Sequence, residues 1–494
     1  MKTNVIIIHT DQHRQECLGA YGNRDVKTPH IDSLANDGVI YTNHFCSYPV
    51  CTPSRYSLLT GMYSSVHRGM NNRCTLPPGI ATFAAELKKN EYRTAAVGKM
   101  HFTPTYLDAG FDTMILAEQD GDGRFDDDYH KYLRERGLLD EIDLYDQRRE
   151  YRRNAPESYF ECFGAQCSDL PCEHHSTTYI TERALEQIDS FRTDGANLLM
   201  AGYIKPHHPM DPPMPYAAMY DPDSLTLLDG YTEQLAEVDK RSKGYFDNET
   251  LTEKKLRVVM SQYYGTVTHI DDGVGRIINK LKEKGLYNES LIIFTSDHGD
   301  YLGYRHLLLK GGPMYEPLVK IPLIIKFPAS WGKKGVENDL SSNIDIAGTI
   351  LSVCGMPPAP GMQGWDLTKN SRRKVVICEK LSKLGNGKRE YMIRTKTHKL
   401  LLGESKDEMR LFNIADDPLE KTNIAPNPEN RTVIADLKEL LIEEMLLNGN
   451  DYPYLDLNAP VINSKTYETV EKERTSMIAY MKEKSKVKPS GLTL

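Results

Sequence analysis

Residues 5–12 read Val5-Ile6-Ile7-Ile8-His9-Thr10-Asp11-Gln12. The apolar run that opens this stretch is short and continuous, which is typical of a strand buried on both faces of a parallel sheet. Asp11 and Gln12 follow the run directly. In open α/β sheets, ligands bind outside the carboxyl ends of the strands. The stretch therefore predicts a central strand that delivers polar side chains to a functional edge.

Four further apolar runs share this character and lie at residues 94–97, 197–203, 291–295 and 322–327. Helical patterns are predicted between and around them at residues 31–37, 80–90, 178–191 and 262–284. Strands that alternate with helices indicate an α/β fold, and runs of this kind indicate buried parallel strands. We expect a mostly parallel central sheet flanked by helices.

The pattern of predicted elements changes after Gly355. A Pro-rich turn at residues 357–361 precedes predicted short strands at residues 375–379, 391–395 and 398–402 and a predicted helix at residues 434–447. A chain of 494 residues exceeds one ordinary core. We therefore predict one large α/β domain in residues 1–370. Residues 371–494 are predicted to form a smaller α+β subdomain with an antiparallel sheet, followed by a surface tail.

The composition argues against two classes of partner. The net charge of −8 disfavours nucleic acid, and no apolar run of about 18 residues predicts a membrane span. The apolar run near Met1 is too short for the core of a signal peptide. The sequence as given therefore favours the cytoplasm, with a trimmed leader as the alternative. No feature of the sequence indicates an oligomeric state.

The cysteines do not suggest a disulfide framework, because there are nine of them in a long chain. Three lie close together and precede two histidines: Cys162, Cys167, Cys172, His174 and His175. The spacing lacks the tight Cys-x2-Cys pair of a zinc site. Free thiols in a loop are the main interpretation, and a structural metal remains the alternative.

Polar side chains follow four of the predicted strands. They are Asp11 and Gln12, then Lys99 and His101, then Lys205, His207 and His208, and finally Asp297, His298 and Asp300. Because the carboxyl ends of parallel strands meet at one edge, we expect these groups to converge on a single active site.

The run Cys51-Thr52-Pro53-Ser54-Arg55 leaves two interpretations open. It can be a turn with a buried thiol. Alternatively, Pro53 fixes the turn and Ser54 caps a helix that begins near Tyr56. Cys51 would then lie close to a helix N-terminus, where an anion or a thiolate is stabilised.

Together with Leu59-Thr60-Gly61, this run resembles the signature of the formylglycine-dependent (type I) sulfatase family, in the alkaline phosphatase-like superfamily. Further motifs follow in the family's order: Asp11-Gln12, residues 28–32, Gly98-Lys99-Met100-His101, Lys205-Pro206-His207-His208-Pro209, Ser296-Asp297-His298-Gly299, Lys310, and Leu411-Phe412-Asn413 with Asp417-Pro418 and Asn423. The resemblance covers nearly the whole chain. It implies a large alkaline phosphatase-like domain and a sulfuric ester hydrolase. Members of the family act on aryl sulfates, choline sulfate and sulfated sugars, and of these we predict a sulfated carbohydrate as the substrate.

The resemblance also implies the cofactors. Cys51 would be converted to formylglycine (3-oxoalanine), whose hydrate is the nucleophile. A divalent cation would be bound by Asp11, Gln12, Cys51, Asp297 and His298. Oxygen ligands from Asp and Gln suit calcium or magnesium on chemical grounds, and the family favours calcium. Considered separately, Asp11-Gln12 can be a helix cap and Asp297-His298-Gly299 a turn.

The remaining roles follow from the same resemblance. Arg55 would hold the diol formed from Cys51. Lys99 and Lys310 would bind the sulfate oxygens. His101 would accept a proton from the second hydroxyl, and His207 would be the general acid, with adjacent His208 as the alternative. The simpler alternatives are surface charges for the lysines and satisfied polar residues for His101 and His208.

Weaker candidates surround this set. Asn71, Asn72 and Arg73 lie one loop beyond the Cys51 helix, and His306 follows the metal loop as a possible pocket residue beside Tyr304. The acidic run at residues 120–128 favours a solvated loop over a calcium site. Residues 117–175 are rich in tyrosine: Tyr129, Tyr132, Tyr145, Tyr151 and Tyr159. They are interpreted either as the wall of a sugar site or as a solvated insertion.

Two other functions remain as alternatives. One is a phosphonate monoester or phosphodiester hydrolase of the same superfamily; those enzymes resemble one another in having tyrosine and threonine where Lys99 and His101 stand here. The other is a catalytically silent, glycan-binding member. The favoured partners are a small-molecule or oligosaccharide sulfate ester and a formylglycine-generating maturation enzyme.

Overall fold

The apolar run near the N-terminus forms strand β1 (Val5–Asp11), and every residue of this strand is buried. It lies inside an eight-stranded sheet of order β4-β3-β5-β1-β6-β7-β2-β8. β1 pairs in parallel with β5 (Asn197–Pro206) on one side and with β6 (Leu291–Ser296) on the other. The predicted central parallel strand is therefore confirmed.

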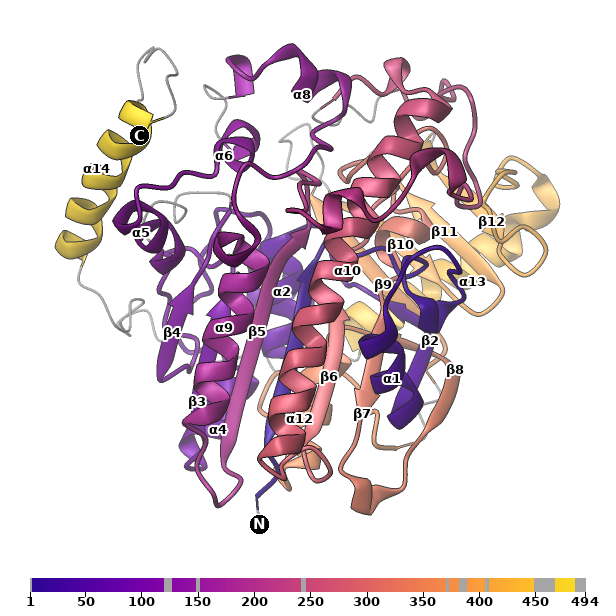
Figure 1. Ribbon diagram of the computed structural model, residues 1–494. Helices are drawn as coiled ribbons and strands as arrows, with labels where there is room; N and C mark the ends of the chain where they lie inside the picture. The colour runs from indigo at the N-terminus through magenta and orange to yellow at the C-terminus, as the bar shows by residue number, and fades with distance from the viewer. Residues whose placement is uncertain are drawn as a thin grey trace.

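The structure is a computed structural model (Figure 1). It describes residues 2–119, 127–147, 152–240, 246–369, 373–381, 389–403, 405, 408–447 and 467–484. The other strands of the large sheet are β2 (Val39–Phe45), β3 (Arg93–Gly98), β4 (Thr113–Leu116), β7 (Leu323–Lys326) and β8 (Gly335–Ser342). Of these, β2, β4 and β8 were not predicted from the sequence.

The direction of β7 differs from the prediction. This strand runs antiparallel to both β6 and β2, whereas the other pairs of the sheet are parallel. An apolar run carries no information about strand direction, which depends on the connection to the preceding strand. The segment between β6 and β7 stays at the carboxyl edge of the sheet, so the chain enters β7 from that edge.

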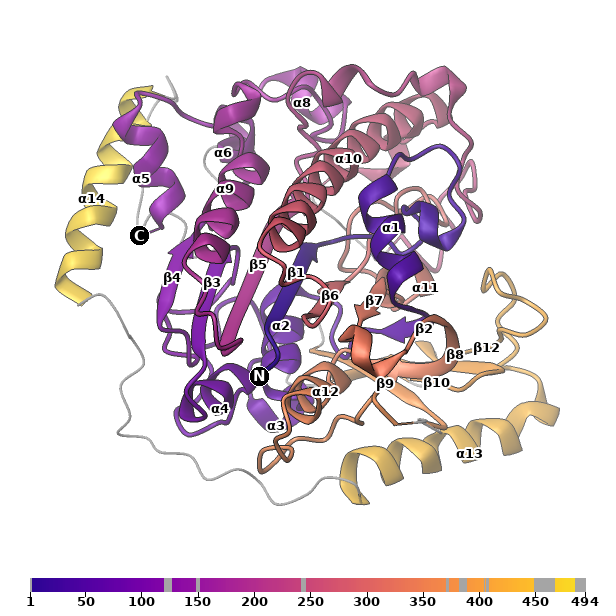
Figure 2. The same ribbon diagram turned by 60° about the horizontal axis from the view of Figure 1, so that its bottom comes forward.

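Helices cover both faces of the sheet, and β1 shows how the sequence arranges them. Ile6 and Ile8 pack in the core beneath α9 (Ser176–Asp189) and α10 (Glu253–Glu283), which cover the near face in Figure 1, beside α1 (Pro29–Asp37). Val5 and Ile7 point the other way, into the core beneath three further helices. These are α2 (Cys51–Thr60), α4 (Phe83–Lys89) and α12 (Asp345–Val353), seen in Figure 2. The alternation follows from the two-residue period of a strand.

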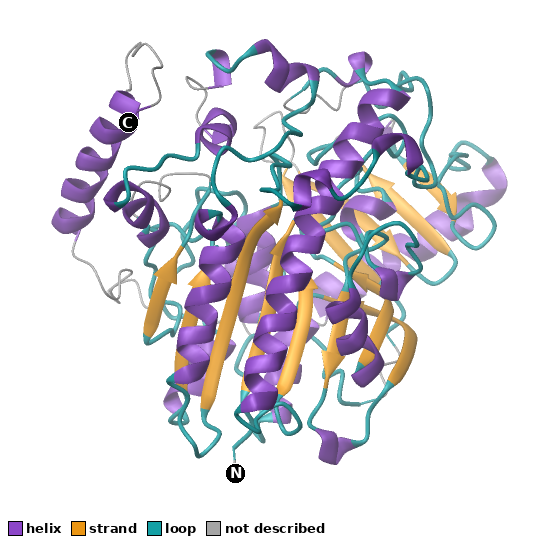
Figure 3. Ribbon diagram, viewed as in Figure 1, coloured by secondary structure: helices purple, strands orange, loops and turns teal. Residues whose placement is uncertain are grey.

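A separate four-stranded antiparallel sheet follows in the chain, with the order β12-β11-β10-β9 (Figure 3). Its strands are β9 (Val376–Leu381), β10 (Arg389–Arg394), β11 (His398–Leu402) and β12 (Arg410–Asn413). One face packs on α13 (Arg431–Ile442) through Ile434 and Leu437. The other face packs on Phe45 and Leu318 of the large unit. The predicted antiparallel α+β subdomain is therefore confirmed.

The expected surface tail contains a docked helix, α14 (Tyr467–Lys484). Met477 and Met481 are buried against Leu144 of α6 (Glu141–Gln147), next to α5 (Asp128–Glu135). Two apolar residues four apart make one face of a helix, although Lys and Glu dominate the composition here. The remaining short helices are α3 (Ser64–His67), α8 (Glu157–Glu161) and α11 (Glu316–Val319). No helix in the described ranges has the length and apolarity needed to cross a bilayer.

Candidate active site

The four strands with predicted polar ends are neighbours in the sheet, in the order β3-β5-β1-β6. Because they are parallel, their carboxyl ends meet at one edge, as expected. Lys99, His207, Asp11 and Asp297 follow or end these strands. All four side chains are at least nine-tenths buried. The predicted convergence on one site is therefore seen in the structure.

Cys51 enters this edge from the loop after β2 as the first residue of α2. The helix begins earlier than the predicted start near Tyr56, so Ser54 is not its cap. Ser54 Oγ instead donates to the carbonyl of Asp297 (2.6 Å) and accepts from Asn343 Nδ2 (2.9 Å). The helix start is thereby fixed against the β6 loop, because Ser54 is already inside the first turn.

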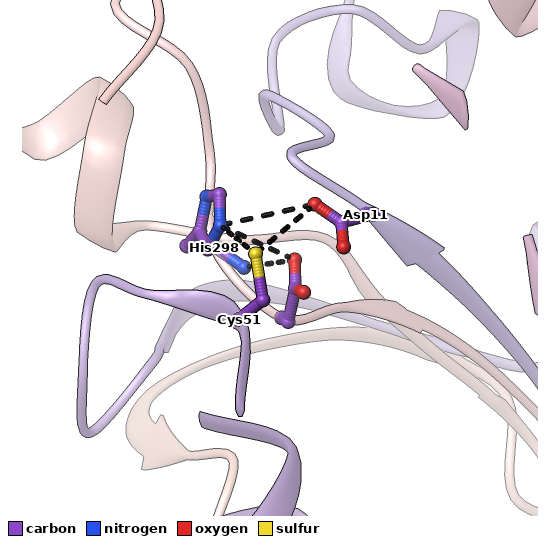
Figure 4. A group of neighbouring side chains, drawn as sticks. Asp11, Cys51 and His298 are labelled. Atoms are coloured by element: carbon purple, nitrogen blue, oxygen red, sulfur yellow. Dashed lines mark hydrogen bonds and ion pairs between the residues drawn. The ribbon is translucent and has the colours of Figure 1, made fainter. Parts of the chain in front are cut away.

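Four buried side chains, Asp11, Cys51, Asp297 and His298, place one ligand atom each within 4.8 Å of one another. Figure 4 shows Cys51 pointing toward the His298 ring and Asp11. Cys51 Sγ lies 3.6 Å from Asp11 Oδ1 and 3.3 Å from His298 Nε2. His298 Nε2 lies 3.9 Å from Asp11 Oδ1 and 3.8 Å from Asp297 Oδ1. This spacing suits a single shared cation.

The donor atoms are prepared for such a cation. His298 Nδ1 donates to the carbonyl of Gly299 (2.9 Å), which leaves a lone pair on Nε2. Burial lowers the pKa of His298 to about 4, so the ring is neutral at physiological pH. Gln12 Nε2 donates to Asp300 Oδ2 (2.6 Å), while Gln12 Oε1 is buried without a hydrogen-bond partner among the described residues. A buried oxygen in this state fits a cation ligand, so the predicted residues fit a divalent metal ion.

Arg55 joins the two carboxylates of this group. Its Nε lies 2.9 Å from Asp297 Oδ2 and its Nη2 lies 3.0 Å from Asp11 Oδ2. Burial opposes ionisation of Asp11, but Lys99, His207, Lys310 and Arg55 outweigh it and hold its pKa well below its usual value. The Asp11 carboxylate is therefore ionised, and its charge is balanced by Lys99 after β3, Arg55 on α2 and Lys310 in the loop after β6.

Lys310 is the cation in contact with the cysteine. Its Nζ donates to Cys51 Sγ (2.9 Å) and to His298 Nε2 (3.2 Å). Burial, followed by the charge of Asp11, raises the pKa of the Cys51 thiol to about 12. The helix start was expected to favour a thiolate, and burial outweighs that effect. The unmodified thiol is therefore a poor nucleophile at neutral pH.

Lys99 contacts Asp11, a predicted metal ligand, and Gln119, which the sequence analysis did not identify. Lys99 Nζ lies 2.9 Å from Asp11 Oδ2 and donates to Gln119 Oε1 (3.3 Å). Gln119 Nε2 in turn donates to the carbonyl of His208 (2.8 Å) and to Asp143 Oδ1 (2.6 Å). Gln119 thus connects the loop after β3 to the turn after β5. The only sequence signal was the short apolar run at residues 114–116 that precedes it.

The paired histidines have different surroundings. His207 Nδ1 donates to the carbonyl of His208 (2.6 Å), and the two rings stack with centroids 4.2 Å apart. Nε2 is therefore the atom of His207 available for proton transfer. Burial, followed by Lys310 and His208, lowers the pKa of His207 well below its ordinary value. Lys205, which precedes them, points into a separate buried group: it pairs with Asp211 and donates to Pro209 O (2.9 Å).

The weaker candidate residues differ in their position relative to the Cys51 helix. Asn72 Oδ1 accepts from the backbone N–H of Thr52 (3.1 Å), so Asn72 borders the Cys51 helix. Asn71 is exposed and caps Arg73 N (2.8 Å). His306 Nδ1 donates to Thr232 O (2.7 Å), and the ring stacks on Tyr231. Among the described residues, no hydrogen bond, ion pair or ring contact joins His306 to the Cys51 group.

The described tyrosines of the tract at residues 117–175 pack on the protein interior, while much of residues 153–162 is exposed. Tyr129 and Tyr159 are buried in the main core. The acidic run was predicted to be solvated, and this is wrong at Asp127, which is fully buried and caps α5. A hydrated run of acids cannot be distinguished by composition from one that supplies helix caps. Residues 120–126 and Tyr151 lie outside the described residues.

The three clustered cysteines are free thiols. In the described part of the chain, potential metal-binding groups occur at Cys51 and at His30 with Asp271 and Asp272, so none includes Cys162, Cys167 or Cys172. This agrees with the main interpretation of these cysteines.

The arrangement defines a class of protein. Buried Arg55 and Lys99 and half-buried Lys310 surround a ligand set for a cation, and His101 and His207 follow the paired strands β3 and β5. Cations directed at one point stabilise the negative charge of a transferring anionic group. An open α/β sheet with this edge therefore indicates a hydrolase of anionic esters.

Comparison with known proteins identifies the family. A model described as Sulfatase matches residues 3–356, and one described as N-sulphoglucosamine sulphohydrolase, C-terminal, matches residues 306–446. An arylsulfatase of Clostridium perfringens is 29% identical, with 93% of this chain and 97% of the relative covered. An N-acetylglucosamine-6-O-sulfatase of Bacteroides thetaiotaomicron is 25% identical, with 90% and 86% covered.

Among solved structures, the phosphonate monoester hydrolase of Agrobacterium radiobacter shares the fold with a TM-score of 0.75 and 22% identity. The match covers 94% of this chain and 100% of that one. At this identity the likeness concerns the fold alone. The chain belongs to the sulfatase family, and it is a sulfuric ester hydrolase.

Proposed function

We propose that this protein removes sulfate from a sulfated carbohydrate, with formylglycine made from Cys51 at the centre of the site. The proposal rests on the position of Cys51 Sγ, which lies 2.9 Å from Lys310 Nζ and beside a ligand set for a divalent cation.

The hydrate of formylglycine supplies a hydroxyl nucleophile, and its second hydroxyl allows the aldehyde to be regenerated. Lys310 and Lys99 bind the sulfate oxygens from two sides, because their ammonium groups approach the Cys51 position from the β6 loop and from β3. Arg55 positions residue 51 and balances Asp11 and Asp297. These cations stabilise charge that develops on the transferred group.

Two histidines move protons in this scheme. His101 accepts the proton of the second hydroxyl through a ring nitrogen. His207 protonates the leaving oxygen through Nε2, since its Nδ1 is engaged by the His208 carbonyl. Burial and Lys310 keep the pKa of free His207 low, and an incoming sulfate offsets Lys310 and favours protonation. This engagement of Nδ1 supports His207 over His208 as general acid.

We propose calcium as the metal ion, held by Asp11, Gln12, Asp297, His298 and residue 51. Calcium accepts irregular sets of oxygen ligands, whereas magnesium requires a near-octahedral set. Bound cation stabilises the folded state by about 2.7 kcal/mol when its concentration is 100 times its dissociation constant. A chelator is therefore expected to lower the melting temperature and the activity together.

Calorimetry before and after chelation, followed by addition of calcium or magnesium, measures this effect. The control is Gln12→Ala, which removes one oxygen ligand and should raise the calcium concentration needed for recovery. Recovery by magnesium alone would identify magnesium as the metal. A melting temperature that chelation leaves unchanged in both proteins would contradict the cation site.

The substrate proposal rests on sequence likeness to the Bacteroides thetaiotaomicron N-acetylglucosamine-6-O-sulfatase and on the Lys99 and His101 pair. The matured protein is expected to release sulfate from members of a panel of sulfated mono- and disaccharides. Phosphonate monoesters and phosphodiesters form the second arm of the panel. Turnover in the second arm alone would favour the rival hydrolase, and saccharide binding without turnover would favour a silent, glycan-binding member.

A further inference from the structure

Glu118 is a buried carboxylate that the sequence did not bring to attention, two residues beyond the end of β4. Its Oε1 accepts from the backbone N–H of Met100 (3.0 Å) and of His101 (2.9 Å), and its Oε2 lies 3.2 Å from the same His101 N–H. One side chain thus binds two successive amides of the loop that carries Lys99 and His101.

This loop has an unusual backbone. Gly98 has φ +84° and His101 has φ +57°, in the left-handed region that residues other than glycine seldom adopt. Helix α2 binds the carbonyl side of the loop, where Thr52 Oγ1 donates to His101 O (2.9 Å) and Arg55 Nη1 donates to Lys99 O (2.6 Å). Glu118 binds the amide side. The conformation is therefore clamped between α2 and the segment after β4.

The position of the His101 ring depends on this backbone conformation. The residue is only 2% exposed, and neither ring nitrogen has a hydrogen-bond partner among the described residues. A buried ring without polar anchors takes its position from its backbone and from packing. We propose that Glu118 is a positioning residue, which holds the Met100–His101 backbone so that the His101 ring faces the residue 51 position.

Glu118 is itself anchored. Its backbone N–H donates to Asp127 Oδ2 (2.5 Å), and Asp127 Oδ1 accepts from His130 N (3.0 Å) at the start of α5. The buried Asp127 that contradicted the solvated-loop prediction therefore anchors the backbone of Glu118, whose carboxylate binds the loop.

Ionisation of Glu118 does not stabilise the folded protein. Burial raises its pKa to about 7, against an ordinary value near 4.5. The unfolded chain releases this proton above about pH 4.5, whereas the folded protein retains it until about pH 7, so folding is progressively disfavoured as the pH rises between them. Above pH 7 the carboxylate opposes folding to the full extent. Ionisation of this carboxyl therefore opposes folding near neutral pH, whereas its two amide hydrogen bonds hold the conformation of the loop.

Asp271 on α10 provides a matched control. It is also a buried carboxylate with a pKa raised to about 7 by burial, and it also accepts from two successive amides, those of His30 (3.1 Å) and Ile31 (2.7 Å). Those amides begin α1, and none of the contacts described for the site involves them. Asp271→Ala therefore tests the general cost of losing such a clamp.

The inference rests on the proposed role of His101. Glu118→Ala is expected to lower kcat by about 10- to 100-fold, because a displaced catalytic group costs this much, while KM stays close to the wild-type value. Glu118→Gln keeps one acceptor oxygen and should recover most of kcat. Asp271→Ala should leave kcat near wild type. Equal losses in Glu118→Ala and Asp271→Ala would overturn the proposal.

A double-mutant cycle separates positioning from a structural role. Because Glu118 acts through His101, Glu118→Ala should slow a His101→Ala enzyme no further. If the two losses simply multiply, the proposal is wrong.

Amide hydrogen exchange tests the clamp without any substrate. The amides of residues 98–102 should exchange faster in Glu118→Ala than in wild type, Glu118→Gln or Asp271→Ala. Unchanged exchange in Glu118→Ala would overturn the clamp whether or not sulfate esters are hydrolysed. Faster exchange in a protein that turns over no sulfate ester would instead uphold the clamp and refute the proposed function.

Discussion

Replacing Cys51 with alanine is expected to lower kcat by about 10⁵-fold or more, the scale seen when a catalytic nucleophile is removed. The change deletes the group that contacts Asp11, His298 and Lys310, while these neighbours keep their positions. Cys51→Ser should be almost as inactive. Serine carries one hydroxyl, whereas the formylglycine hydrate carries two. A sulfated serine therefore has no second hydroxyl to expel the sulfate, and the nucleophile is not regenerated.

Sulfate release measured with a matured wild type, Cys51→Ala and Cys51→Ser tests this prediction. Cys378→Ala on β9 is the matched control, because Cys378 is also a fully buried thiol. It should retain activity. Mass spectrometry of the peptide that contains residue 51 should show the lighter aldehyde only in active preparations. Full activity with an intact thiol would refute the formylglycine mechanism.

Replacing Arg55 with methionine should reduce both stability and activity. Removing one partner of a buried ion pair costs about 3–5 kcal/mol, since the remaining charge is left uncompensated. Here two carboxylates lose their shared partner, because Arg55 pairs with Asp11 and Asp297 and all three are buried. Arg55→Lys should recover little, because one ammonium cannot reach both carboxylates in the geometry of a guanidinium.

The loss should depend on the metal ion. A bound cation also balances Asp11 and Asp297, so chelation should enlarge the difference in unfolding free energy between wild type and Arg55→Met. Arg373→Met is the control: Arg373 is equally buried and pairs with Asp345 and Glu444, away from the described cation ligands. Urea unfolding should show a destabilised Arg373→Met with no dependence on chelator and near-normal turnover below its transition. A chelator effect of equal size in both variants would contradict the model.

The central sheet was predictable because each buried strand is a short apolar run bounded by polar residues. Such patterns identified β1, β3, β5 and β6, and the residues that follow them include Asp11, Lys99, His207 and Asp297. The pattern did not predict the edge strands or the direction of β7. β4 and β8 lie at the two edges, where burial is partial and the apolar signal weak.

The candidate site was predictable where a functional residue is adjacent in sequence to a strand end or to the Cys51 run. Residues that bind a site residue only through a tertiary contact were not predictable. Gln119 and Glu118 each bind a site residue from a different segment. Their identities carry no signal of this, since a buried acid or amide is recognised only by what surrounds it.

The sequence by itself determined the order of the chemical groups: a strand followed by Asp11, a cysteine close to the start of a helix, and lysines and histidines at further strand ends. Local patterns suffice for this, because each group is fixed by its neighbours along the chain. Only the tertiary structure decided which charges balance one another. Arg55 and Asp297 are 242 positions apart, and their contact depends on how parallel strands are ordered in the sheet. Electrostatic energies inside a protein depend on distances and burial, and both arise only when the chain is folded.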